Sequence, residues 1–215
     1  MCLMPWRDAA VAENKRLPIA ERRMREMYPI FLKLGGRNAL VVGGGKMAAL
    51  RVKQLIRAGA NVTVIAPKAG AEIEELTKTE SIVLVRRRFE RTDINWSYFI
   101  VIAATNDCEV QREVAEEAER RGILCNVVDK PESCNFYMPA IVHRGEMKIA
   151  ISTSGRSPSL AGKMREYLEQ AIPENAADLT KAVGLLRSRL KARIPDDLAA
   201  QKRLVGEFVE KVLEK

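Results

Sequence analysis

From Tyr28 to about Pro139, short apolar runs alternate with segments in which apolar residues recur every three or four positions. The runs have the length of buried strands, and the spacing between them is typical of amphipathic helices. Continuous apolar strands that alternate with helices indicate an α/β fold with a doubly wound parallel sheet. The pattern predicts strands at residues 38–42, 62–66, 81–85, 99–104 and 123–128, and helices at residues 46–58, 71–77 and 109–121.

The alternation stops near Pro139, and the rest of the chain has a different pattern. Residues 148–152 form a strand-like run, and Ser157-Pro158 opens a helix because serine caps helices and proline suits the first helical position. A buried stripe is expected on this helix at Leu160, Met164, Leu168 and Ile172. Two amphipathic helices follow, with apolar stripes at Leu179, Val183, Leu186 and Leu190, and at Leu198, Val205, Phe208 and Val212.

A glycine-rich turn, Gly43-x-Gly45-x-x-Ala48, directly follows the first strand and opens the first helix. In the dinucleotide fingerprint the first glycine makes the tight turn, the second lets the backbone approach a pyrophosphate, and the small third residue packs helix on strand. The helix N-terminus then faces the phosphates. We therefore expect a Rossmann cofactor site that includes Gly43, Gly45, Lys46 and Met47. The alternative is a glycine turn that binds nothing.

The second strand lacks the acidic residue that often holds the adenine ribose. It ends Ala66-Pro67-Lys68, without a carboxylate. NAD would then contact backbone groups at Ala66 and Pro67, or Lys68 would accept a 2′-phosphate and favour NADP; the sequence leaves both open. Thr105 and Asn106 follow the fourth strand, where a Rossmann sheet meets its cofactor, and we expect them to contact it rather than form only a turn.

The composition narrows the class of protein. The chain has 215 residues, of which 47% are hydrophobic and 30% charged, so it can bury a core. Its net charge of +8 suits an anionic partner, but the basic residues do not cluster and no nucleic-acid motif is evident. The apolar runs are far shorter than the ~20 residues of a membrane span. No secretion signal is evident at the N-terminus, so a cytoplasmic protein is expected.

Cysteine and histidine offer little for a metal site. Cys2, Cys108, Cys125 and Cys134 show no CxxC spacing, which predicts reduced thiols; Cys125 and Cys134 are interpreted as packing residues. His143 is the single histidine, which argues against a three-histidine zinc site. We expect it on the surface, in a polar turn between strand-like segments.

Four later motifs, together with the glycine turn, carry a family resemblance. They are residues 103–106 (AATN), 126–131 (NVVDKP), 135–140 (NFYMPA) and 151–158 (ISTSGRSP). As an ordered set they resemble the precorrin-2 dehydrogenase family of siroheme synthesis. That family includes the N-terminal module of siroheme synthase and stand-alone relatives.

The resemblance implies that precorrin-2, a tetrapyrrole polycarboxylate, is oxidised to sirohydrochlorin with NAD as hydride acceptor. Many members also insert ferrous iron, as sirohydrochlorin ferrochelatases, and others only dehydrogenate; this stays open. A homodimer is implied as well. We expect an N-terminal extension at 1–27, an NAD-binding Rossmann domain at 28–138, a dimerisation segment at 139–172 and a helical C-terminal domain at 173–215.

Asp129 is the main catalytic candidate, because it matches the aspartate of the family's NVVD motif. It follows the fifth strand, at the sheet edge where open α/β proteins bind ligands. A carboxylate there can take the proton released in dehydrogenation or hold an incoming metal ion briefly. The alternative is an aspartate that only starts a turn. Asn126, polar within an apolar strand, is expected to contact nicotinamide or substrate; the alternative is a structural hydrogen bond to a neighbouring loop.

Ser152, Thr153 and Ser154, with Arg156 close by, precede a helix N-terminus. Backbone N–H groups and hydroxyls there suit a substrate carboxylate, while the alternative is simple capping of the helix by Ser157. A competing hypothesis for the whole chain is a non-catalytic Rossmann module that senses a nucleotide and regulates a partner through its helical tail.

Overall fold

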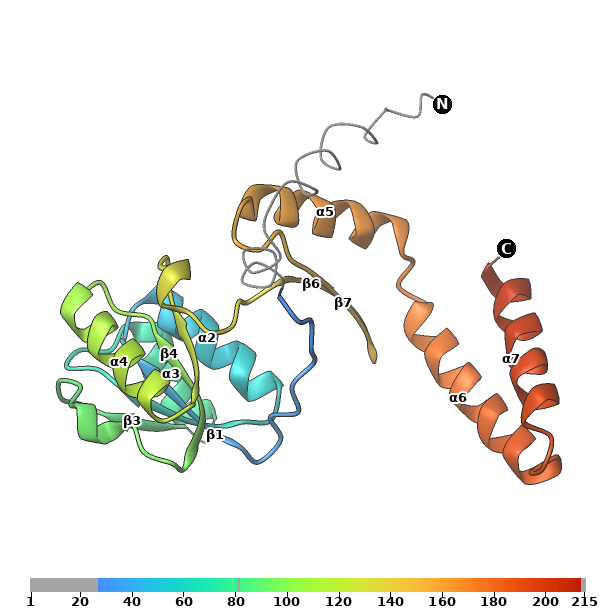
Figure 1. Ribbon diagram of the computed structural model, residues 1–215, viewed down its shortest axis with the longest axis horizontal. Helices are drawn as coiled ribbons and strands as arrows, with labels where there is room; N and C mark the ends of the chain where they lie inside the picture. The colour runs from blue at the N-terminus through green and yellow to red at the C-terminus, as the bar shows by residue number, and fades with distance from the viewer. Residues whose placement is uncertain (1–26, 81, 214–215) are drawn as a thin grey trace, which may run out of the picture.

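The computed structural model describes residues 27–80 and 82–213 (Figure 1). The extension expected at residues 1–27 lies outside the described residues except for Met27. No helix in the described part of the chain is long and apolar enough to cross a membrane.

Five parallel strands form the main sheet, in the order β3-β2-β1-β4-β5. Their bounds are β1 (Asn38–Val42), β2 (Asn61–Ile65), β3 (Val83–Val85), β4 (Tyr98–Ala103) and β5 (Leu124–Val127). The predicted strands all form, each within two residues of its expected ends. The α/β, doubly wound fold is therefore confirmed.

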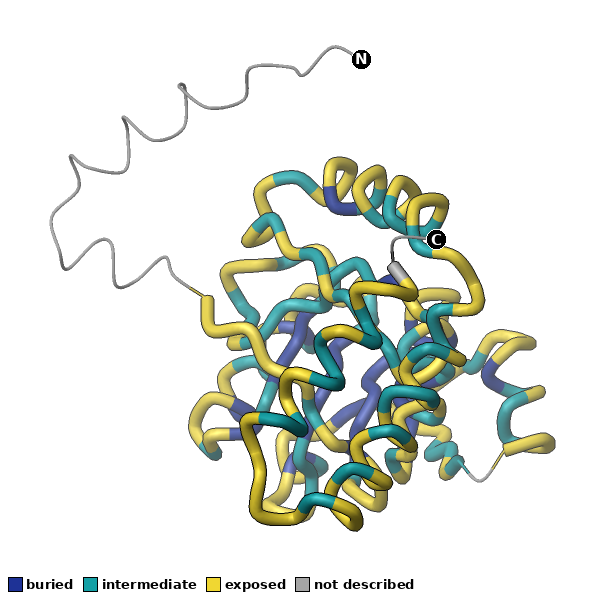
Figure 2. Tube along the Cα trace, turned by 90° about the vertical axis from the view of Figure 1, so that its right-hand side faces the viewer, coloured by how far each residue is buried: buried dark blue, intermediate teal, exposed yellow. Residues whose placement is uncertain are grey.

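Helices α2 (Lys46–Arg57), α3 (Ala71–Thr79) and α4 (Cys108–Arg120) cover the sheet. Successive residues of β1 point to opposite faces, so Val41 packs in a cluster with Val52 of α2, and Leu40 packs in a cluster with Val114 of α4. All four side chains are fully buried, and Figure 2 shows the buried residues gathered in the interior of the domain. The strands read as unbroken apolar runs because both of their faces lie in a core.

The strand order reverses beside β1, since the chain passes from β1 to β2 on one side and later to β4 on the other. Loops that leave the carboxyl ends of β1 and β4 therefore diverge to opposite faces and leave a crevice between them. The glycine turn after Val42 and the loop after Ala103 border this crevice.

A separate antiparallel hairpin, β6 (Ala140–Arg144) with β7 (Met147–Ile151), follows the main sheet. The prediction that His143 lies in a turn is wrong: it lies in β6 opposite Lys148, and the turn is formed by Gly145 and Glu146. A five-residue strand with only Val142 buried has too short an alternation to stand out in the sequence. His143 is exposed, as expected.

Helix α5 (Pro158–Ala171) packs beside the hairpin (Figure 1). As predicted, Ser157 caps it, with its Oγ accepting from the backbone N–H of Leu160 at 3.3 Å. Arg144 of β6 satisfies the other end of the helix. Its Nε donates to the carbonyl oxygen of Ile172 at 3.0 Å, and its Nη2 donates to that of Glu169. One side chain thus joins the hairpin to the helix C-terminus.

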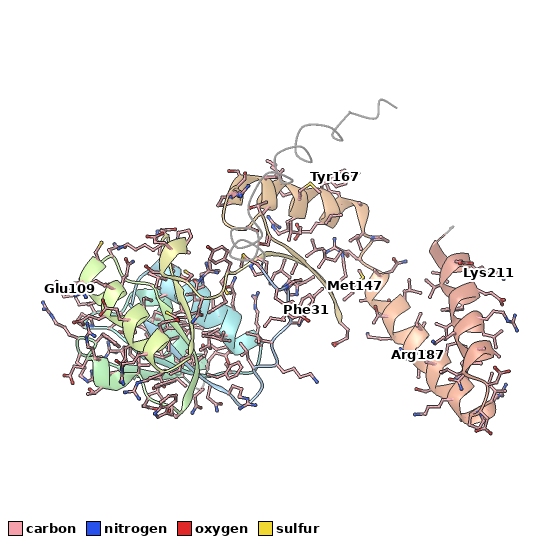
Figure 3. The ribbon with its side chains drawn as sticks, in the orientation of Figure 1. Phe31, Glu109, Met147, Tyr167, Arg187 and Lys211 are labelled. Carbon is pink, nitrogen blue, oxygen red and sulfur yellow. The ribbon has the colours of Figure 1, made fainter. Side chains whose placement is uncertain are left out.

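The buried stripe expected on α5 is only partly right: Leu168 and Ile172 are half-buried, but the first two residues of the stripe are exposed. Leu160 is 45% exposed and Met164 is 42% exposed, while Ala161 is the buried residue of the helix. Tyr167, one turn beyond Met164, is 64% exposed as well (Figure 3). The spacing correctly identified an apolar helix face, but its N-terminal part, at Leu160 and Met164, stays exposed in the described part of the chain.

Helices α6 (Ala176–Arg193) and α7 (Leu198–Leu213) form an antiparallel pair at the far end from the main sheet (Figure 1). Both were predicted from their apolar spacing. A Cβ at Gly145 would lie 2.6 Å from the Cβ of Ala177, so the hairpin turn sits tightly against the start of α6.

Candidate functional site

A cavity of about 410 Å³ lies at the carboxyl ends of β1 and β4, where the strand order reverses. Gly44, Gly45, Lys46 and Met47 line it from the glycine turn and the first turn of α2, and Ala104, Thr105, Asn106 and Asp107 line it from the loop after β4. Five expected cofactor contacts, Gly45, Lys46, Met47, Thr105 and Asn106, therefore meet in one place.

The glycine turn is packed so tightly that two of its residues leave no room for a side chain. A Cβ at Gly43, where φ is +129°, would lie 2.2 Å from the carbonyl oxygen of Ala104. A Cβ at Gly44 would lie 2.1 Å from the carbonyl oxygen of Lys68. Gly44 carries no assigned role in the three-residue fingerprint, so its constraint emerges only from the fold. Around Gly45 nothing lies within 4 Å of such an atom, which leaves space for a ligand to approach the backbone.

The N-terminus of α2 presents a positive field to the cavity. Its N-cap residue is Gly45, no described side chain caps the helix, and no acidic residue lies in its first turn. The first backbone N–H groups of a helix have no partner within the helix and attract anions. Exposed Lys46 adds a full positive charge. This arrangement suits the pyrophosphate of a dinucleotide.

Ala66 and Pro67 lie on the other side of the turn and do not line the cavity. Ala66 is buried, Pro67 and Lys68 are exposed, and the backbone N–H of Gly70 donates to the carbonyl oxygen of Gly44 at 2.8 Å. The tip of β2 carries no carboxylate, so an adenosine moiety would meet backbone atoms or the Lys68 amine there.

Gln111 of α4 holds the loop that carries Thr105. Its Nε2 donates to the carbonyl oxygen of Thr105 at 2.6 Å, and the Thr105 hydroxyl accepts from the backbone N–H of Asp107 at 3.2 Å. Gln111 is buried, and its Oε1 has no hydrogen-bond partner. Sequence reasoning missed it, although a glutamine in register with the buried Val114 and Ala118 of the same helix was a signal.

Asp129 stands two residues beyond β5 in a turn. Its φ is +62°, which is uncommon for a residue with a side chain, and its side chain is exposed. The backbone N–H of Val128 donates to the carbonyl oxygen of Ala103 at 3.0 Å, so this turn lies beside the loop that lines the cavity. The catalytic candidate is therefore adjacent to the cofactor candidates.

A partly buried guanidinium on α2, that of Arg51, is close enough to Asp129 for the two charges to interact. Burial lowers the pKa of Arg51, and the Asp129 carboxylate opposes that shift. Its Nη1 donates to Oε1 of Gln54 at 2.9 Å, while its Nε is buried without a hydrogen-bond partner. Sequence reasoning missed Arg51, because nothing local links it to a residue 78 positions later.

Asn126 is buried in β5 and makes the bonds of the structural alternative. Its Nδ2 donates to the carbonyl oxygen of Phe136 at 3.1 Å and to Sγ of Cys134 at 3.5 Å. These bonds hold the segment after the turn against the strand. Contact of Asn126 with nicotinamide or substrate stays a prediction.

Side-chain hydroxyls organise the expected carboxylate-binding loop before α5. The Thr153 hydroxyl accepts from the backbone N–H of Ser157 at 3.1 Å and donates to its carbonyl oxygen at 3.0 Å. The Ser152 hydroxyl accepts from the backbone N–H of Ser154 at 3.1 Å. Ser154 and Gly155 have φ values of +52° and +75°. Arg156 is exposed next to them.

Tyr137 connects this loop to the segment that follows the catalytic candidate. Its hydroxyl donates to the carbonyl oxygen of Pro131 at 3.3 Å, and a Cβ at Gly155 would lie 3.3 Å from its ring. The loop of residues 152–156 therefore approaches the turn of Asp129. The described residues contain no group of three or more histidine, cysteine or acidic side chains that could hold a metal ion.

The fold and this crevice define a Rossmann-type dinucleotide-binding protein. A family described as putative NAD(P)-binding matches residues 30–140, just over half of the chain. A family described as sirohaem biosynthesis protein central matches residues 144–171. The NAD(P)-binding character of the domain is thereby established.

One solved structure and two curated proteins show which family of dinucleotide-binding proteins the chain resembles. A solved structure described as SirC, precorrin-2 dehydrogenase, is 31% identical, with a TM-score of 0.73 over 85% of this chain and 89% of that one. Siroheme synthase of Methylococcus capsulatus is 42% identical over 189 residues, and that of Thioalkalivibrio sulfidiphilus is 39% identical over 189 residues. The chain belongs to the family of precorrin-2 dehydrogenases and siroheme synthase dehydrogenase modules.

The siroheme synthases are much longer than the matched part. The match covers 88% of this chain but 39% of the Methylococcus protein and 37% of the Thioalkalivibrio protein. The SirC structure, in contrast, is matched over most of its length.

Proposed function

We propose that this protein oxidises precorrin-2 to sirohydrochlorin, with NAD as the hydride acceptor. One observation carries the proposal: the likeness to SirC, precorrin-2 dehydrogenase, extends over 89% of that chain. An enzyme is favoured over the nucleotide sensor, because the likeness continues past the nucleotide-binding domain into the hairpin and helices.

The cofactor-binding part of the mechanism rests on α2. Its uncapped N-terminus and Lys46 would hold the pyrophosphate, and the open backbone at Gly45 lets it come close. Thr105 and Asn106 would contact the cofactor from the opposite wall of the cavity. When bound, the nicotinamide accepts the hydride.

Asp129 would act as the base. Oxidation of precorrin-2 removes two hydrogens: one leaves carbon as a hydride, and the other leaves as a proton. An exposed carboxylate beside the cofactor cavity can accept that proton as it is released. Arg51 keeps a positive charge near this carboxylate.

The substrate carboxylates would bind at the loop before α5. Ser152, Thr153 and Arg156 flank Ser154 and Gly155, the two consecutive residues of positive φ, and backbone N–H groups in such a turn can form a concave site for an anion. Tyr137 lies against this loop at Gly155 and bonds to Pro131, two residues beyond Asp129, so it would help to set the distance between the bound carboxylate and the base.

Anaerobic turnover of precorrin-2 with NAD tests the proposal. We expect NADH and the sirohydrochlorin spectrum to appear together, and Asp129→Asn to lower kcat by about 100-fold or more. Asp196→Asn, in the exposed loop before α7, is the matched control and should retain activity. Nucleotide binding without any turnover of precorrin-2 would favour the sensor instead.

Ferrochelatase activity is a second candidate, which the likeness to siroheme synthases supports. Ferrous iron would be a substrate, held transiently by Asp129 while the pyrrole protons leave. The same assay with ferrous or cobaltous ion distinguishes the cases. A metallated product supports one site for both steps, and sirohydrochlorin alone limits the protein to dehydrogenation.

The choice of NAD over NADP is part of the proposal, as is a cytoplasmic location with reduced thiols. Lys68 at the tip of β2 is the residue that could accept a 2′-phosphate. If NAD is the natural cofactor, Lys68→Ala should leave the KM for NAD within about twofold, because a charge that meets no phosphate adds little affinity. A higher kcat/KM with NADP than with NAD would contradict this choice.

A homodimer through residues 139–172 is also proposed. The apolar face of α5, with Leu160, Met164 and Tyr167 exposed, supports it, since a single chain rarely leaves such a stripe uncovered. Sedimentation or light scattering should give twice the chain mass, and Met164→Glu should shift it toward one chain mass. A monomeric wild-type protein would contradict the dimer.

A further inference from the structure

The turn that carries Asp129 is wrapped around one sulfur atom, Sγ of Cys134. The backbone N–H of Val127 donates to this sulfur at 3.1 Å. The sulfur lies 3.3 Å from the carbonyl oxygen of Val127 and 3.2 Å from that of Lys130, so the thiol proton can be donated to either. These two residues flank the turn in which Asp129 stands.

Asn126 reaches the same sulfur. Its Nδ2 lies 3.5 Å from Sγ of Cys134, and its other bond goes to the carbonyl oxygen of Phe136. Both catalytic candidates are therefore attached to Cys134, one through its side chain and one through the flanking backbone. The chain reaches this position through a short 3₁₀ helix, η2 (Pro131–Ser133), whose end is closed by the bond from the Cys134 N–H to Pro131.

The thiol suits this position for chemical reasons. It combines an acceptor and a donor in one atom, so it can accept from the N–H of Val127 and donate to a nearby carbonyl oxygen. Burial raises the pKa of the Cys134 thiol, so the donor proton is retained at neutral pH. Asp129 needs such support, because a non-glycine residue at φ +62° persists only where its surroundings hold it.

We propose that Cys134 is a positioning residue for Asp129: its thiol fixes the turn of residues 127–130 and so aims the carboxylate at the substrate. This inference rests on the proposed dehydrogenase function. It gives Cys134 a role in orienting the Asp129 carboxylate, which differs from metal binding and from packing.

Substitutions that separate hydrogen bonding from packing test the proposal in the full chain. Cys134→Ala and Cys134→Val remove the donor and acceptor, whereas Cys134→Ser keeps both. Because a small misplacement of a catalytic group costs much rate, the two apolar variants should lower kcat by about tenfold or more with the KM for NAD within about twofold. Cys134→Ser should recover kcat to within about threefold of wild type, because the serine hydroxyl also donates and accepts.

Cys125→Ala is the matched control. It removes the same atom from a buried cysteine of β5 that makes no side-chain bond to the turn in the described structure. Its kcat should stay within about twofold of wild type, although its melting temperature should fall because of the cavity.

A double variant tests whether Cys134 acts through Asp129. In an Asp129→Asn background, Cys134→Ala should lower the residual rate by less than about twofold, since coupled residues are not additive. A full additive loss, an apolar variant with wild-type kcat, or a serine variant as slow as alanine would overturn the proposal.

Amide hydrogen exchange keeps this inference separate from the proposed function. Val127 N–H should be protected in wild type and Cys134→Ser and exchange faster in Cys134→Ala. If wild type shows no turnover, the dehydrogenase proposal fails. Unchanged exchange at Val127 in Cys134→Ala would then overturn the positioning role on its own.

Discussion

The backbone at Gly43 lies so close to Ala104 that a Cβ on the glycine would be 2.2 Å from the alanine carbonyl oxygen. This contact joins the glycine turn after β1 to the loop after β4, the two walls of the cavity proposed to hold the cofactor. Because φ at Gly43 is +129°, an alanine there would be strained even with space around it.

Gly43→Ala should therefore separate the two walls. We expect a loss of about 1–3 kcal/mol in the free energy of unfolding, from strain at a special backbone conformation, together with weaker NAD binding. Chemical denaturation and titration with NAD measure the two effects. Gly184→Ala, on the exposed face of α6, is the control and should stabilise the helix by about 0.5–1 kcal/mol. Wild-type stability and affinity in Gly43→Ala would contradict the tight contact.

Gly45→Asp should change stability and cofactor affinity in opposite directions. Aspartate is a favoured N-cap, φ at this position is −84°, and a Cβ there meets nothing, so unfolding should cost about 0.5 kcal/mol more. The same carboxylate would face the pyrophosphate and should weaken NAD binding by about tenfold or more, because like charges repel at the helix N-terminus. Gly45→Asn keeps the cap without the charge and is the matched control. Equal NAD affinity in the two variants would argue against a phosphate at this N-terminus.

Arg51→Met tests the charge beside Asp129. The variant removes a partly buried guanidinium whose Nε has no partner, so stability should stay constant or rise. It also removes the positive charge near the proposed base. We therefore expect kcat/KM for precorrin-2 to fall by about tenfold, which corresponds to the loss of about 1.4 kcal/mol of charge interaction. Arg51→Lys should retain most of the activity. Steady-state kinetics beside thermal melts would show whether function and stability separate as expected.

Glu117 of α4 should make the fold sensitive to acid. Hydrogen bonds from Arg120 and Arg121 lower the pKa of its carboxyl to about 2, and its side chain is 7% exposed. Because the pKa is lower in the folded state, the stabilisation is complete above the ordinary value of 4.5 and is lost as the pH falls toward 2.

The measurement is the melting temperature of wild type and Glu117→Gln between pH 7 and pH 3. The variant should be less stable at pH 7, and the difference should shrink as the pH falls below 4.5. Glu146→Gln, in the exposed hairpin turn, is the control. A constant difference across this range would show that Glu117 stabilises α4 by another means.

Local sequence alone determined the elements of the main sheet. β1 was expected at residues 38–42 and is Asn38–Val42, because a strand buried on both faces is an unbroken apolar run. The glycine turn could also be predicted from the sequence, since its spacing and its place between a strand and a helix are both local features. The motif order along the chain then identified the family before any contact was known.

Tertiary structure decided what depends on distant residues. The carbonyl oxygen of Lys68 leaves no room for a side chain at Gly44. The charge of Arg51 interacts with that of Asp129. The sulfur of Cys134 accepts a hydrogen bond from Val127, at the end of β5. The exposed stripe of α5 was misjudged for the same reason: periodicity shows that a helix has an apolar face but not what covers it. Sequence patterns report local conformation and average burial, whereas close contacts and facing charges exist only once the chain has folded.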